Sequence, residues 1–226
     1  NYTTTNMTPD QIHNLGLAQV ARIHKEMRVV QKKMAVKGDL QAFFKYMRTE
    51  PKFYAAETAE GRALYLSETQ KAQDAVTPLL PKWFGVLPKA PLVVKPVEAF
   101  REKSAGKAFY QRPSPDGSRP GTYYANLYTM ADMPLTEVEA LFYHEGVPGH
   151  HLQIALAMEL DLPNFRKYGG VTAFVEGWGL YSESLGYDLG LYKDPYSQFG
   201  QLTYDMWRAI RLVVDTGMHY FDWSRQ

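Results

Sequence analysis

Apolar side chains in the first part of the chain recur at the three- and four-residue spacing of an amphipathic helix. Thr8 can cap this helix, Pro9 suits its first position, and Gln11 completes a capping box. The helix is predicted to end near Gly38, and its apolar face consists of Ile12, Leu15, Val20, Ile23, Met27, Val30 and Met34. Similar signals predict further helices over about residues 39–48, 59–80, 136–144, 151–160, 172–187 and 195–220.

The middle of the chain has a different pattern, because β-branched and aromatic residues replace the helical period there. Strands are predicted over residues 92–94, 108–112 and 122–129, with turn signals rich in proline and glycine between them. The helical pattern then resumes at a second candidate capping box, formed by Thr136 and Glu139. The predicted class is therefore mainly α, with a small antiparallel β insert.

The length, composition and charge of the chain exclude several classes of site and partner. The 226 residues are interpreted as a single domain, with helices over 8–85, a small sheet over about 92–130 and further helices over 135–226. The sequence contains no cysteine, which excludes disulfides, thiol nucleophiles and cysteine-bound metals. With 25 basic and 24 acidic side chains the net charge is +1, so no nucleic-acid partner is expected. No apolar run approaches the length of a membrane span, and none is expected in this chain.

Three of the six histidines fall in the segment His144-Glu145-Gly146-Val147-Pro148-Gly149-His150-His151. The usual zinc-peptidase helix carries two histidines four residues apart, with a glutamate general base after the first. Here Pro148 occupies the place of the second histidine. On a straight helix His150 would lie about 120° around and about 9 Å along the axis from His144, too far to share one zinc ion. A break in the helix is predicted, because Pro148 lacks an amide hydrogen and its ring clashes with the preceding turn.

The length of the break decides which histidine joins the first one at a metal. A loop of two extra residues brings in His150, whereas a loop of three brings in His151, and both alternatives stay open. Glu176 is the candidate third ligand, because a carboxylate within the apolar stretch 171–178 is unfavourable unless it is paired or bound to a metal. Glu183 lies on the same helix face two turns later and could hold a ligand through a hydrogen bond.

A zinc ion at this place would need a general base and partners for the oxyanion. Glu145 is the candidate base, because it follows His144 and would point about 100° away from it, toward the attacking water. The candidate oxyanion partners are Tyr123, Tyr124, Tyr181, Tyr204 and His219.

One face of the last predicted helix carries an unusual set of polar side chains. At about 100° per residue, Tyr204, Arg208, Arg211, Asp215 and His219 fall within an arc of about 80°. Arginine has a planar fork that suits a carboxylate, so Arg208 or Arg211 is a candidate for binding the terminal carboxylate of a substrate, with Asp215 as a supporting partner. The alternative interpretation is a solvated face with an ion pair between Arg211 and Asp215.

Five stretches occur together in a specific combination: Thr8–Gly16, Pro120–Asn126, His144–Gln153, Glu176–Trp178 and Arg211–Gly217. In this combination the chain resembles the C-terminal half of bacterial domain-of-unknown-function family 885. The resemblance implies a helical fold like that of gluzincin-type zinc metallopeptidases, in which two histidines and a downstream glutamate hold zinc. It also implies that an N-terminal part of the same protein is missing here.

Together these observations predict a zinc-dependent hydrolase that binds one zinc ion and cleaves peptide or other small amide substrates. One alternative is a non-catalytic domain whose metal site is structural or a relic. Another is a helical scaffold without metal, in which His144 and Glu176 only form hydrogen bonds. Metal content and hydrolysis that depends on Glu145 distinguish the three. For its location, both an exported, periplasmic protein and a cytoplasmic one stay open, with a lean to the exported one.

Overall fold

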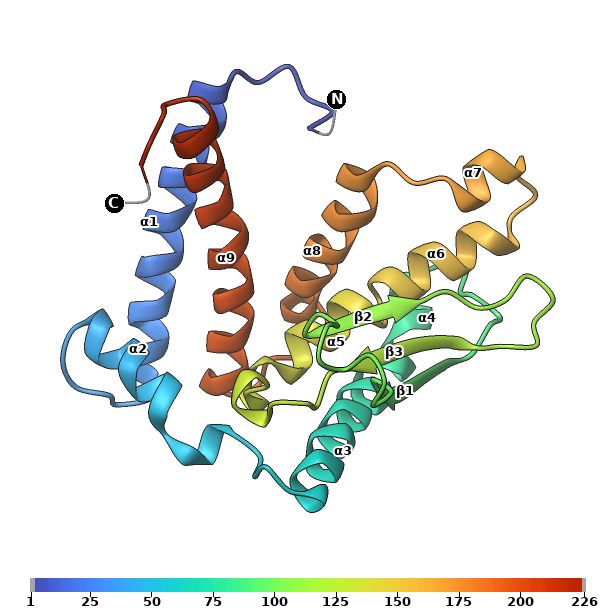
Figure 1. Cartoon of the computed structure of the whole chain (residues 1–226), viewed down its shortest axis with the longest axis horizontal. Coiled ribbons are helices and arrows are strands. Elements are labelled where there is room, and N and C mark those ends of the chain that lie inside the picture. The colour runs from blue at the N-terminus through green and yellow to red at the C-terminus, as the bar shows by residue number, and fades with distance from the viewer. Residues whose placement is uncertain (1–2, 225–226) are drawn as a thin grey trace.

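Helices dominate the computed structural model, which describes residues 3–224 and confirms the mainly α class with a small β insert (Figure 1). The helices are α1 (Pro9–Lys33), α2 (Leu40–Thr49), α3 (Ala59–Val76), α4 (Leu80–Trp83), α5 (Val138–Glu145), α6 (His150–Glu159), α7 (Asn164–Tyr168), α8 (Thr172–Asp188) and α9 (Pro195–His219). The strands are β1 (Leu92–Pro96), β2 (Ala108–Gln111) and β3 (Gly121–Ala125). Within residues 3–224, no helix combines the length and the apolar character that crossing a membrane requires.

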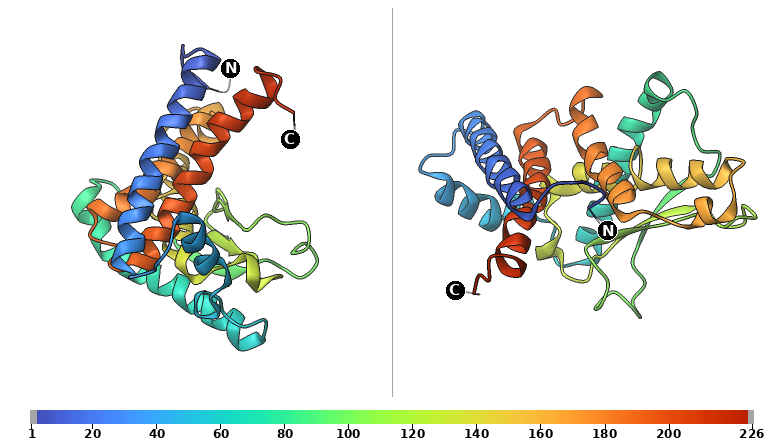
Figure 2. Two further views of the ribbon diagram at one scale, coloured as in Figure 1. Left: turned by 90° about the vertical axis from the view of Figure 1, so that its left-hand side faces the viewer. Right: turned by 90° about the horizontal axis from the view of Figure 1, so that it is seen from above.

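Helices α1 and α9 form an arm, lying side by side along most of their length (Figures 1 and 2). The predicted capping box at the start of α1 is confirmed, because Thr8 and Gln11 exchange hydrogen bonds. Close to that end, His13 Nδ1 lies 2.8 Å from Thr216 Oγ1 of α9. Helix α2 completes the arm's own core, which contains Ile23, Met27, Val30, Leu40, Phe43, Met47, Phe199, Leu202 and Met206.

The rest of the chain forms a body around α5, which packs against α3, α8 and α9. All of its residues from Ala140 to His144 are buried. The apolar core around α5 includes Tyr65, Tyr123, Met130, Met133, Leu141, Phe142, Tyr143 and Tyr192. Helix α5 is therefore the central helix of the body.

The three strands form a mixed sheet in the order β1-β3-β2. Strand β3 is central; it pairs in parallel with β1 and antiparallel with β2. The expectation of a wholly antiparallel insert is therefore wrong for one of the two pairings. The reason is the long connection over residues 97–107, which carries the chain past the place of a neighbouring strand. The hairpin from β2 then inserts β3 into that place.

The predicted capping box at Thr136 and Glu139 does not form. Leu135–Glu137 is a 3₁₀ turn, and Glu137 precedes α5 without a side-chain cap. Helix α9 packs against this turn so closely that a side chain at Gly200 would collide with the carbonyl oxygen of Thr136. Tertiary packing thus overrides the local capping signal.

Candidate metal centre

The predicted break in the histidine segment is present as a separation into two helices, α5 and α6. The four residues between them, 146–149, form a turn that belongs to neither helix. A backbone hydrogen bond of 2.9 Å from His151 to the carbonyl of Gly146 closes this turn. From α8, the indole of Trp178 donates a hydrogen bond of 2.9 Å to the carbonyl of Pro148. The break is therefore held from within and from the neighbouring helix.

This break brings together His144, His150 and Glu176, whose ligand atoms all lie within 4.8 Å of one another. Glu176 Oε2 is 3.5 Å from His144 Nε2, and its Oε1 is 3.6 Å from His150 Nε2. The two imidazole rings lie 4.6 Å apart and nearly perpendicular, at 81°. Both histidines are buried, whereas the side chain of Glu176 is 57% exposed and faces the approach to the group. This group could hold a metal ion.

A second carboxylate, that of Glu183, orients His144. His144 Nδ1–H donates a hydrogen bond of 2.8 Å to Glu183 Oε1, which leaves Nε2 directed at the group. Glu183 is fully buried, and burial raises the pKa of its carboxyl group. A carboxylate behind a metal-binding histidine fixes the tautomer and the ring orientation.

Opposing influences act on the protonation of the two histidines. Burial disfavours the charged form of His144, but its contacts with Glu176 and Glu183 outweigh burial and raise the pKa of His144 to about 9. Burial, together with the charge of His144, lowers the pKa of His150 to about 4. The carboxylates therefore favour positive charge on His144, whereas His150 is favoured in its neutral form.

Close packing of α8 on His144 depends on Gly179, which sequence analysis did not single out. A methyl group at Gly179 would lie 2.6 Å from His144 Cε1 and 2.8 Å from its Nε2. Glycine within a helix is about 1 kcal/mol less favourable than alanine, so a glycine at this position indicates that another part of the chain packs closely against the helix.

Glu145, the last residue of α5, lies beside the group and outside it. Its Oε2 is 4.0 Å from His150 Nε2, and its side chain is only 13% exposed. Burial raises the pKa of Glu145 to about 7; the charge of Glu176 acts in the same direction, and that of His144 opposes it. A carboxylate with a pKa near neutrality can both accept and return a proton.

His151 lies outside the group. Its Nε2–H donates a hydrogen bond of 3.0 Å to the carbonyl of Ala90, and its Nδ1 accepts one of 3.0 Å from the hydroxyl of Tyr110. Both ring nitrogens are thus used in tying α6 to the sheet. Of the two histidines that the spacing left open, the structure brings His150 to Glu176.

The two adjacent tyrosines of β3 point to opposite faces of the sheet, as successive strand residues must. Tyr123 is fully buried. Burial is the largest cause of its raised pKa, and the charges of two neighbouring tyrosines and of Glu145 raise that pKa further. Tyr124 stacks on Phe109, with ring centres 5.0 Å apart, and Arg101 lies 4.9 Å from its ring. The structure thus places Tyr124 away from the group, which corrects the expectation that both tyrosines serve the site.

The polar side chains along α9 lie in two different places, because the helix extends from the metal group out along the arm. Tyr204 is buried, and Arg208 Nη2 lies 3.6 Å from Glu183 Oε1, so these two side chains reach the group. His219 lies about 16 Å further along the helix axis than Arg208, because each residue rises about 1.5 Å. His219, Arg211 and Asp215 are exposed on the arm, and in the described part of the chain no ion pair joins the last two. Sharing an arc did not bring His219 or Asp215 to the histidines.

Tyr181, on α8, is also outside the group. Its side chain is exposed, and its ring lies 5.8 Å from that of Trp178.

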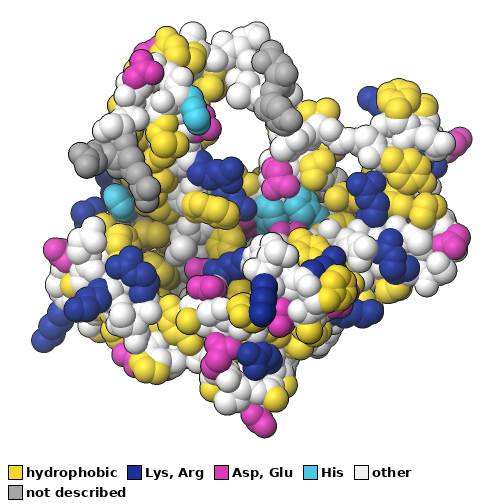
Figure 3. Space-filling model, in the orientation of Figure 1, with side chains coloured by type: hydrophobic (Ala, Val, Ile, Leu, Met, Phe, Trp, Pro, Cys, Tyr) yellow, Lys and Arg dark blue, Asp and Glu magenta, His cyan; other side chains and the backbone are white. Residues whose placement is uncertain are grey.

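In the space-filling view, histidine side chains reach the surface in a hollow between the arm and α8 (Figure 3). An acidic side chain borders them, and basic and hydrophobic side chains form the wall on the arm's side (Figure 3).

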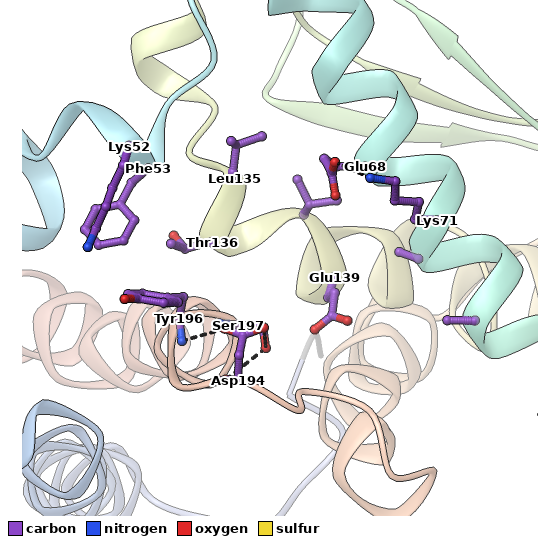
Figure 4. A pocket seen from close by; sticks show the side chains of 13 residues that line it. Lys52, Phe53, Glu68, Lys71, Leu135, Thr136, Glu139, Asp194, Tyr196 and Ser197 are labelled. Carbon is purple, nitrogen blue, oxygen red and sulfur yellow. Dashed lines mark hydrogen bonds and ion pairs between the residues drawn. The ribbon is translucent and has the colours of Figure 1, made fainter. Parts of the chain in front are cut away.

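A separate cavity of about 520 Å³ lies between α3, the start of α5 and the start of α9 (Figure 4). Glu139 projects into it from α5, facing the capping residue Asp194 and Ser197 of α9 (Figure 4). Asp194 is engaged with the backbone of α9, to which it accepts two hydrogen bonds. This cavity does not include the histidine group, so the candidate chemistry lies in the hollow.

Comparisons with known proteins identify a family and a shared fold, and none of them assigns an activity. The model of the family described as "Bacterial protein of unknown function (DUF885)" matches residues 1–226. A protein of Colwellia psychrerythraea, described as a putative lipoprotein, superposes with a TM-score of 0.94 and 36% identity, covering 99% of this chain and 39% of its own. A protein of unknown function from Shewanella oneidensis with the same description has a TM-score of 0.71 and 18% identity, covering 96% of this chain and 41% of its own. The chain thus spans about two fifths of the length of either protein. No curated protein matches it.

Proposed function

Because the chain belongs to this DUF885 family, whose description assigns no activity, we propose from the site itself that it is the metal-bearing part of a zinc-dependent hydrolase. The substrates are peptides or other small amides. One zinc ion is held by His144, His150 and Glu176. The resemblance to gluzincin-type metallopeptidases belongs to this proposal.

The observation that carries the proposal is the spacing of the ligand atoms. Two atoms bound at about 2.1 Å in a tetrahedron around zinc lie about 3.4 Å apart. Glu176 lies 3.5 Å from His144 through Oε2 and 3.6 Å from His150 through Oε1, and one ligand atom from each of the three residues lies within 4.8 Å of the other two. A zinc ion would draw these atoms slightly closer together. Three protein ligands, with a fourth position left for water or substrate, are typical of catalytic zinc, whereas structural zinc has four protein ligands.

Zinc in this position would polarise the scissile carbonyl and acidify the attacking water. Glu145 would serve as the general base for that water and as the proton donor to the leaving amine, because its carboxylate lies beside the three ligands and is not one of them. Glu183 keeps the ring of His144 in place. Tyr123 and Tyr204 are the remaining candidates for stabilising the oxyanion, since both have buried hydroxyl groups without a hydrogen-bond partner among residues 3–224.

Zinc content and turnover of purified variants test the two halves of the proposal separately. We expect His144→Ala and Glu176→Ala to abolish stoichiometric zinc, whereas His151→Asn retains it. Glu145→Gln should keep zinc and lose at least about 10²-fold in turnover of a peptide substrate. Zinc retained in both ligand variants would overturn the ligand assignment. Unchanged turnover in Glu145→Gln would leave a metal-binding domain without catalysis.

We propose in addition that the protein is exported to the cell envelope, because its two structural relatives are described as lipoproteins. The matched region occupies only 39% and 41% of those proteins. We therefore propose that the complete enzyme also contains a part that corresponds to the rest of their length. Fractionation of cells that express the intact protein tests the location. Recovery in the cytoplasmic fraction alone would contradict it.

A further inference from the structure

We propose that Arg208 binds the terminal carboxylate of the substrate, so that the enzyme acts near the C-terminus of short peptides. This inference rests on the proposed function and narrows its substrate class. It also separates Arg208 from Arg211, which the spacing along the helix treats alike.

The guanidinium group of Arg208 is held at the edge of the metal group. It lies 4.8 Å from the ring of Trp207 and 5.5 Å from that of Tyr204, so aromatic side chains fix its direction. Its Nη2 is 3.6 Å from Glu183 Oε1, and the same oxygen accepts the hydrogen bond from His144. Arg208 thus contacts Glu183, and Glu183 in turn contacts the proposed ligand His144.

One arm of this guanidinium lacks an acceptor. Arg208 Nη1 is buried, and no hydrogen-bond partner for it exists within residues 3–224. A buried donor without a partner is unfavourable, and a charged one more so. A carboxylate satisfies this need best, because its two oxygens match the fork of the guanidinium.

The simpler interpretation is that Arg208 only neutralises the buried Glu183. That contact is 3.6 Å long and involves Nη2 alone, so it is longer than a good hydrogen bond and leaves Nη1 unused. A counter-ion role therefore explains the position of Nη2 and leaves Nη1 unexplained.

The aromatic neighbours of Arg208, though not Arg208 itself, border a space for the residue that bears the carboxylate. A cavity of about 250 Å³ adjoins the arginine's aromatic neighbours and is lined by Lys107, Glu137, Thr203, Tyr204 and Trp207. Lys107 is paired with Glu137, so neither charge is available to compete for the substrate. Because Arg208 contacts Glu183 and Glu183 contacts His144, a carboxylate bound by Arg208 lies close to the metal group.

Arg211 supplies the matched control. It is exposed one turn further along α9, and its guanidinium lies 5.5 Å from the ring of the same tryptophan. It has the same chemistry as Arg208 and the same aromatic neighbour, but it lies further along the arm from Glu183.

The test is binding, which does not require turnover. The probes are N-(hydroxamoylacetyl)phenylalanine and its C-terminal amide, because a hydroxamate binds zinc and the pair differs only in the carboxylate. With the intact, zinc-loaded protein, calorimetry should show the acid binding about ten- to a hundredfold more tightly than the amide. Arg208→Gln should abolish this preference, whereas Arg211→Gln should retain it.

Each other outcome counts against a defined part of the scheme. Equal binding of acid and amide by the unaltered protein would overturn the carboxylate site and leave the zinc site intact. Failure of both probes to bind would overturn the zinc site and this inference with it. If Arg208→Gln does not fold, Arg208→Lys decides, because it keeps a charge beside Glu183 but lacks the fork. An undiminished preference in the lysine variant would overturn the inference.

Discussion

At the scale of single residues, the geometry of the metal group depends on what lies behind the ligands. His144 is confined between the carboxylate of Glu183 and the backbone of α8 at Gly179. Both contacts join residues more than thirty positions apart, and both act on the direction of Nε2. The ligand set is therefore only as well ordered as these two neighbours.

Gly179→Ala tests this confinement. The added methyl group would lie 2.6 Å from the ring of His144, so the ring or the helix must move. We expect a loss of about 10- to 100-fold in zinc affinity, the usual effect of disturbing a residue behind a ligand. Competition with a zinc chelator measures it.

Gly177→Ala is the control for that variant. It lies on the same helix, and a methyl group there would meet nothing within 4 Å. It should retain zinc and raise the stability by up to about 1 kcal/mol, since alanine favours the helix. Equal zinc affinities in the two variants would contradict the confinement of His144.

Glu139 gives a prediction about pH. Burial raises the pKa of its carboxyl group above the ordinary value of 4.5. The folded state then binds more protons than the unfolded state above pH 4.5, so stability falls as the pH rises from there through the raised pKa. At neutral pH the charged Glu139 is destabilising. Glu139→Gln should therefore raise Tm by about 2–4 °C at pH 7, and the gain should disappear near pH 4.

Thermal unfolding of both proteins between pH 4 and pH 8 measures this effect. Asp74→Asn is a suitable control, because Asp74 is exposed and, among residues 3–224, its side chain bonds only to Gln70 on its own helix. A gain in Tm that does not change with pH would mean that the effect of Glu139→Gln is not electrostatic.

At the scale of elements, the separation of α5 from α6 is what brings the two histidines together. Proline and glycine predicted that a break would occur between residues 144 and 150, and it does. Its shape depends on α8, whose Trp178 bonds to the carbonyl of Pro148. The same helix supplies Glu176, so one element holds the break and provides a proposed ligand.

Trp178→Phe removes that bond and keeps an aromatic ring. We expect the free energy of unfolding to fall by about 1–3 kcal/mol, because the carbonyl loses its partner. Zinc affinity should fall as well, since the break relaxes. Chemical denaturation and zinc titration measure the two effects. Tyr181→Phe, at an exposed neighbour in the same helix, should change neither.

At the scale of the whole molecule, the site depends on the arm as well as on the body. Arg208 and Tyr204 come from α9, whereas the ligands come from α5, α6 and α8. The arm is tied together where α1 crosses α9 at Gly16: a methyl group there would lie 2.7 Å from Val213 Cγ2. The distance between the two helices thus follows from one small residue.

Gly16→Ala should therefore force the helices of the arm apart. We expect a loss of about 1–3 kcal/mol in stability, the usual effect of overpacking. Gly85→Ala is the control, because a methyl group at Gly85 meets nothing within 4 Å. Chemical denaturation compares the two. Equal stability of both variants would mean that α1 and α9 adjust without strain.

Local rules, acting over a few residues, allowed much of this structure to be anticipated from the sequence by itself. They located the cap at Thr8 and the helix break at Pro148, because capping and proline geometry need only neighbouring residues. Glu176 was chosen because a buried carboxylate needs a partner, but its side chain is 57% exposed, so that reason was wrong although the residue does join the histidines. Contacts between distant segments decided the rest. They selected His150 over His151, turned Tyr124 away, paired β1 with β3 in parallel and set Glu183 behind His144. Spacing along one helix fixes an angle and a rise, but only the packing of other helices against it determines which of its side chains meet.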